Sequence, residues 1–136
     1  MAIQFRSTTR DARLDGIETE AGASCSMRIF SGAVPADVTQ ANPSGQLWDI
    51  NLPADWMAAA SGGAKAKAGT WSGAAGAGGV ALSFRIYKSQ ATKDGTTCII
   101  QGTVGQGSGD LSLDNTNIAN GQTVTINTFT LTDGNA

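Results

Sequence analysis

The sequence predicts a mainly β fold: an antiparallel β-sandwich or jelly roll of about seven short strands, with a short N-terminal helix. Two observations lead to this prediction. The chain of 136 residues contains 18 Gly and 15 Thr, and these residue types are typical of tight turns and half-buried strands. Short segments of alternating polarity also recur along the chain, separated by Gly, Pro and Asn turn signals. A chain of this length fits a single domain.

The first 22 residues differ from the rest. Leu14, Ile17 and Ala21 follow the spacing of one helical face, and Gly22 is a natural stop. These features predict a helix over roughly residues 9–21. Because its apolar stripe is narrow, this helix must dock on something to be stable. We expect residues 1–22 to anchor the β domain, residues 23–136, on a partner chain and to be mobile without that partner.

The next part of the chain alternates between strands and loops. Strands are expected over residues 25–31 and 46–52, on either side of a loop over 33–45 that contains two prolines. Pro53 then favours a one-to-two-turn helix near residues 54–60. Alternation returns over residues 65–72, and the segment 73–79 is predicted to be a Gly/Ala loop.

A hairpin is the clearest unit of the second half, with strands over residues 81–89 and 97–104 and a turn at Asp94-Gly95. Its alternation predicts two faces, one formed by Leu82, Phe84 and Ile86 and the other by Ser83, Arg85 and Tyr87. Two further strands are expected over residues 110–113 and 123–131, the second after an Asn120-Gly121 turn. A change of apolar parity predicts a bulge near Asn127 or Thr128.

The charge content favours a protein that binds other proteins. Charged residues make up 15% of the chain, against about 25% in a typical soluble domain. Interface cores are depleted in charge, so we interpret the low value as a sign of assembly. The basic residues do not cluster, which argues against nucleic-acid binding. The first ten residues lack the apolar run of a secretory leader, and no segment is long and apolar enough to suggest a membrane span.

Catalysis is not expected, because the chain has no histidine to act as a general base or metal ligand. Cys25 and Cys98 lie far apart in the sequence and are interpreted as small buried core residues. An oxygen-rich segment around Asp110 and Asp114 fails the calcium-loop spacing, so these side chains are interpreted as turn caps. We therefore expect no enzyme, no cofactor and no metal site.

A second pair of acids, Asp49 and Asp55, is close in sequence, but nothing indicates that the two face each other as a glycosidase requires. The three tryptophans are expected to be mostly buried. Trp56 and Met57 are the best candidates for exposure, because the alanines that follow them give little cover.

Five residues are the expected partner contacts: Arg6, Arg10 and Arg13, which lie in the predicted anchor of residues 1–22, and Trp56 and Met57, which are the candidates for exposure.

Several segments also resemble a known family. They are LPADWMAAASGGAKAKAGTW at residues 52–71, FRIY at 84–87, DGTTCIIQGTV at 94–104 and the tail from residue 109 onward. Together with residues 13–19, they are similar to small structural proteins of tailed bacteriophages, among them capsid cement or decoration proteins. The matching residues are packing and turn residues, and the resemblance implies no catalytic residues.

The resemblance implies a capsid cement protein that clamps neighbouring major capsid subunits on the outside of the head. Its expected partners are the major capsid protein and copies of itself, as a homotrimer, without nucleic acid, membrane or small-molecule substrate. Its expected location is the virion exterior, after synthesis in the cytoplasm of the bacterial host. Two alternatives remain open: a tail or baseplate component, and a carbohydrate-binding module for host adsorption.

Overall fold

A computed structural model describes residues 3–134 and contains one helix, α1 (Ser7–Ala21), followed by strands. A five-stranded sheet has the strand order β2-β1-β6-β7-β8. Its strands are β1 (Ser26–Phe30), β2 (Gln46–Asn51), β6 (Ser83–Tyr87), β7 (Cys98–Gly105) and β8 (Leu111–Ser112). All neighbours in this sheet are antiparallel except the short parallel pair of β7 and β8.

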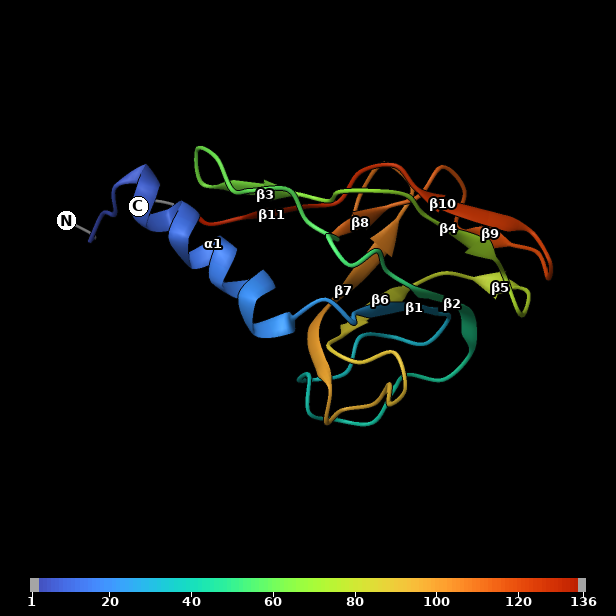
Figure 1. Ribbon diagram of the computed structural model, residues 1–136. Helices are drawn as coiled ribbons and strands as arrows, with labels where there is room; N and C mark the ends of the chain where they lie inside the picture. The colour runs from blue at the N-terminus through green and yellow to red at the C-terminus, as the bar shows by residue number, and fades with distance from the viewer. Residues whose placement is uncertain (1–2, 135–136) are drawn as a thin grey trace.

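The other strands form two-stranded pieces. β3 (Ala64–Ala66) pairs with β11 (Thr130–Thr132), β4 (Trp71–Ala74) with β10 (Thr123–Ile126), and β5 (Gly79–Val80) with β9 (Asn117–Ile118). Between the first two pairs, the Lys67 N–H donates to the Phe129 carbonyl at 2.8 Å. These two pairs therefore continue as one interrupted ribbon, which runs above the central sheet in Figure 1.

The predicted mainly β fold is confirmed, but the side opposite the five-stranded sheet is divided into separate two-stranded pieces. A row of aromatic rings joins the two sides. Trp56 contacts Trp71 with ring centroids 6.3 Å apart, Trp71 contacts Phe129 at 5.5 Å, and Phe129 meets Phe84 edge-on at 5.6 Å. These large rings fill volume that a chain poor in Leu and Val would otherwise leave empty.

The helix predicted near residues 54–60 is absent, and this prediction is wrong. The segment is extended beside residues 66–68: the Ala58 N–H donates to the Ala66 carbonyl at 2.8 Å, and the Ala68 N–H donates to the Trp56 carbonyl at 2.9 Å. Backbone groups used in this pairing cannot also form helical hydrogen bonds. Non-local pairing therefore outweighs the local signal of Pro53.

The two faces predicted for the β6 strand form, with Phe84 and Ile86 in the hydrophobic core and Ser83, Arg85 and Tyr87 outside it. Leu82 precedes β6 and is 49% exposed, whereas all five residues of β6 are buried. The outer face of β6 is covered by the loop over residues 33–45, which packs onto it. Tyr87 on that face donates its hydroxyl to Asn42 Oδ1 at 2.6 Å.

Arg85 holds this covering loop. Its side chain is fully buried and donates to the carbonyls of Gln40 and Asp37 at 2.8 and 3.2 Å. It also donates to the side-chain oxygens of Gln101 and Asn42 at 2.9 and 3.3 Å. Buried guanidinium groups need several oxygen partners, and here the loop supplies most of them.

Other predictions agree with the structure. The hairpin forms as β6 and β7, and α1 begins only two residues before the predicted start. The strand predicted over 123–131 is divided into β10 and β11, with the break at the predicted position of the bulge.

Replacing Arg85 by Met should lower the free energy of unfolding by about 3 kcal/mol, because the loop carbonyls lose their charge-assisted donors. Lys88→Met is the control: Lys88 forms an exposed ion pair with Glu20, and its loss should cost less than about 0.5 kcal/mol. Urea denaturation measures both values. Equal losses in the two variants would contradict the role given to Arg85.

Candidate interaction surface

Helix α1 lies against the β3 end of the ribbon and is held there mainly by polar groups. The Asp15 Oδ1 atom accepts hydrogen bonds from Lys65 Nζ at 2.6 Å and from the Ala60 N–H at 2.9 Å. One turn away, Asp11 Oδ1 accepts from the Gly63 N–H at 2.7 Å. The predicted helix is therefore real, but it docks on its own domain.

Lys65 is the central residue of this contact, with a side chain that is only 1% exposed. Besides Asp15, its ammonium contacts Glu18 Oε2 at 2.8 Å and donates to the Ala58 carbonyl at 2.8 Å. Three oxygens thus match its three N–H donors. Burial alone would lower the pKa of Lys65, but the hydrogen bonds to Asp15 and Glu18 outweigh it and raise that pKa.

The predicted contact arginines are partly engaged within the chain. Arg10 Nη1 donates to the Asp133 carbonyl at 3.0 Å, and Arg13 Nε lies 3.1 Å from Asp133 Oδ2. The guanidinium of Arg13 also lies 4.9 Å from the ring centroid of Phe5. Arg6, at the start of α1, is exposed. Arg10 and Arg13 therefore fasten α1 to the end of the last strand, and a partner role for the three arginines stays a prediction.

Trp56 and Met57 do not form an exposed patch, so their predicted exposure is wrong: they are 0% and 1% exposed. The Trp56 indole N–H donates to the Gly22 carbonyl at 3.3 Å, which joins the core to the end of α1. Trp48 and Trp71 are equally buried, as expected from the sequence. Within this chain, Trp56 and Met57 are packing residues.

The thiols are poorly suited to chemistry. Cys25 and Cys98 are both free and buried. Burial raises the pKa of Cys25 to about 11, with a further contribution from the charge of Glu18. Burial also raises the pKa of Cys98. At neutral pH both groups are therefore thiols and not nucleophilic thiolates.

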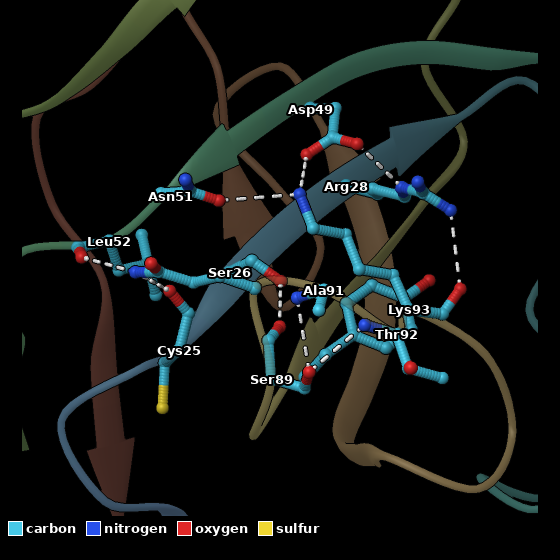
Figure 2. A network of polar contacts seen from close by, with 12 residues as sticks. Cys25, Ser26, Arg28, Asp49, Asn51, Leu52, Ser89, Ala91, Thr92 and Lys93 are labelled. Carbon is cyan, nitrogen blue, oxygen red and sulfur yellow. Dashed lines mark hydrogen bonds and ion pairs between the residues drawn. The ribbon is translucent and has the colours of Figure 1, made fainter.

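Two of the carboxylates singled out in the sequence, Asp49 and Asp110, serve the fold, while Asp55 and Asp114 each line a separate hollow. Asp49 binds Arg28 at 2.8 Å and also binds Lys93, which ties the loop after β6 to the outer face of the sheet (Figure 2). Asp110 accepts from the Thr103 N–H and hydroxyl at 2.9 and 3.0 Å, as a turn cap does. Among residues 3–134, no three His, Cys, Asp or Glu side chains are grouped to hold a metal ion.

A hollow of about 590 Å³ lies between α1 and residues 54–59. Its acidic residues include Asp15 and Glu18, which are already bonded to Lys65. It is therefore the seam of the helix contact.

A second hollow, of about 400 Å³, opens between β7 and β11 and is called the β7–β11 cleft here. Its floor is apolar: Phe84 and Phe129 are buried, and Ile100 and Leu131 are half-buried against the core. Its rim is polar and consists of Gln101, Asp110, Thr130 and Thr132. An apolar floor with a polar rim is typical of a surface that binds another chain.

The β7 side of the cleft has an open backbone edge. β8 pairs only with Val104 and Gly105, so the preceding residues of β7 have β6 as their one strand neighbour. The Val104 N–H donates to the Leu82 carbonyl on the β6 side. Because antiparallel strands alternate in direction, Gly102 and Ile100 also face β6, and Gln101 directs its N–H and C=O toward the cleft.

The β11 side is open in the same way. The Phe129 carbonyl accepts from Lys67, and the Asp133 N–H donates to the Gly63 carbonyl, so these residues face β3. Thr130 and Thr132 then direct their backbone groups away from β3. Both are rim residues of the cleft.

The cleft continues along α1. Ile17 and Arg13 of the helix line a hollow shared with Thr132 and Asp133, and a further hollow shared with Ile99. Three elements, α1, β7 and β11, thus border one surface. Sequence reasoning missed this surface, because an open edge depends on which distant strands pair.

No helix among residues 3–134 is long and apolar enough to cross a lipid bilayer.

Comparison with family models, with curated proteins and with solved structures finds no match for this chain.

Removing the acids that face Lys65 should weaken the helix contact more than removing the lysine. In an Asp15→Asn/Glu18→Gln variant the ammonium stays buried without a counter-charge. In Lys65→Met the two carboxylates remain, and both are partly exposed and can be hydrated. We expect a clear fall of the urea midpoint for the first variant and little change for the second. The reverse order would contradict the arrangement described.

The same contact should depend on pH. Its hydrogen bonds with Lys65 and Ala60 lower the pKa of Asp15 below 3.8, so its contribution to stability is complete above pH 3.8 and is lost as pH falls through the lowered pKa. The pKa of Lys65 is raised above 10.5, so its contribution is present below pH 10.5 and is lost as pH rises through the raised value. Tryptophan fluorescence, to which Trp56 at the end of α1 contributes, should therefore change at both limits, and these changes should diminish in Lys65→Met.

Proposed function

We propose that this protein is a non-catalytic structural subunit that binds other protein chains, and specifically a capsid cement protein of a tailed bacteriophage. The observation that carries the proposal is the β7–β11 cleft, which combines an apolar floor with unpaired backbone groups of Gln101, Thr130 and Thr132. Extended segments of other proteins bind to such edges by adding a strand.

The rest of the molecule supports a binding role. The reactive candidates are occupied or buried: the cysteines are protonated thiols, and Asp49 and Asp110 are bonded within the fold. The low charge of 15% reduces repulsion between neighbouring copies. The resemblance of the sequence to small phage structural proteins directs the proposal to the outside of a capsid.

A carbohydrate-binding role has less support. Such a module stacks sugars on exposed aromatic rings, whereas all three tryptophans are at most 1% exposed and their indole N–H groups donate to backbone carbonyls. In the proposed role, several copies act together: they form a closed oligomer, and each copy adds weak contacts to adjacent major capsid subunits.

Particles that lack the protein should assemble but release their DNA at a lower temperature than complete particles. A subunit that binds only the assembled shell stabilises it, by about 2.7 kcal/mol per site at a hundredfold excess over the dissociation constant. Heat-induced DNA release, followed with a DNA dye, measures the difference. Adding back the purified protein is the control and should restore the original temperature.

The tail alternative gives a different result: heat-stable heads that carry no tail or do not infect. An unchanged release temperature would overturn the cement proposal.

A further inference from the structure

The N-terminal arm, residues 3–6, carries a strand-like pattern outside any strand of the structure. Ile3 and Phe5 alternate with Gln4 and Arg6, and the segment forms neither helix nor strand. Ile3 is 80% exposed and Phe5 is 42% exposed, although Phe5 contacts Arg13. An extended segment with this alternation presents Ile3 and Phe5 on one face and the two polar side chains on the other.

The β7–β11 cleft matches such a segment. Its floor provides apolar contacts from Ile100 and Leu131, and Gln101 directs one N–H and one C=O of β7 toward an added strand. Asp110, an exposed residue on the rim, carries charge opposite to that of Arg6. Backbone pairing, apolar contacts and charge are thus complementary in one place.

The arm of the same chain cannot run along β7. Ile17 marks the point where α1 meets Ile99 of β7, and it lies ten residues after Ser7, or about 15 Å along the helix axis. Ile3 is four residues before Ser7 and Phe5 is two, so an extended arm carries Ile3 at most about 14 Å from the start of the helix. Neither apolar side chain can therefore return along the helix and pair with β7 of its own chain. In Figure 1, the N-terminal end of α1 lies at the end of the helix that is far from β7.

We propose that the N-terminal arm of one copy binds as an added strand along β7 in the cleft of a second copy, with Ile3 and Phe5 on the apolar floor. This inference rests on the proposed function, since it names the partner that occupies the cleft. Each copy then donates one arm and receives one, so a closed ring of copies leaves no cleft empty.

The first test is sedimentation of the full chain without any virus particle. Ile3→Asp/Phe5→Asp should raise the dissociation constant of self-association at least tenfold, because it replaces the two apolar side chains that become buried when the arm binds a second copy. Val80→Asp/Leu82→Asp is the matched control: these side chains are 48% and 49% exposed but lie outside the arm and the cleft. The control should associate like the unmodified chain. Equal weakening of both variants, or of neither, would overturn the inference.

The second test is amide hydrogen exchange, which reports on the backbone of β7. The Gln101 N–H faces the cleft, whereas the Ile100 N–H faces β6. On raising the protein concentration, exchange at Gln101 should slow at least tenfold, while exchange at Ile100 remains slow throughout. In Ile3→Asp/Phe5→Asp, the slowing at Gln101 should disappear.

A synthetic peptide of residues 1–8, added to the Ile3→Asp/Phe5→Asp protein, should restore protection of Gln101. Failure of the peptide to do so would contradict the arm as occupant. If the chain alone is monomeric and Gln101 becomes protected only on capsids, the cleft binds a strand of the shell, and the second-copy inference is wrong while the cement proposal stands. If copies associate through the arm but DNA release is unchanged, the inference stands and the cement proposal fails.

Discussion

The buried ammonium of Lys65 decides how the helix sits on the strands. It is enclosed by Asp15, Glu18 and the Ala58 carbonyl, and α1 contributes few apolar contacts of its own, since its buried residues are Leu14 and Ala21. A helix with so narrow an apolar stripe depends on its tertiary contacts. Its position in turn sets the border of the hollows that continue the β7–β11 cleft and the direction in which the N-terminal arm leaves the helix. The interaction surface thus depends on one polar contact, made by a residue whose strand partner is Leu131 of the cleft floor.

Arg85 is a second case in which a buried polar group, and not large apolar side chains, holds one part of the chain on another. The loop over residues 33–45 has few large apolar side chains, yet it covers β6 because its carbonyls accept from a buried guanidinium. Period-two alternation placed Arg85 on the face opposite Phe84 and Ile86, and arginine on such a face of a half-buried strand is usually solvated. The sequence carries no local sign that a loop some 45 residues earlier supplies the oxygens that make burial possible.

Local signals predicted the elements that depend on local interactions. The stop at Gly22, the hairpin of β6 and β7 and the break near Asn127 all follow from turn chemistry and side-chain period. The failures are non-local. Trp56 and Met57 have the composition of an exposed short helix, but the backbone around them pairs with residues 66–68 and both side chains are buried. The cleft could not be predicted either, because the direction of the Gln101 N–H depends on the register between β7 and β6.

Open strand edges expose a protein to uncontrolled pairing with other chains, and folds usually protect them with charge, proline, bulges or covering loops. This chain protects part of β7 in that way, since Asp110 caps the Thr103 N–H and β8 covers Val104 and Gly105. The protection ends at Gln101, where the floor becomes apolar and the edge of β11 opens onto the same cleft. A chain with few charges is poorly placed to guard two converging edges by repulsion. Two open strand edges that meet at an apolar cleft floor are therefore better explained as a binding site for one specific strand than as edges left unprotected. The exposed alternating arm of the same chain supplies a strand of that kind.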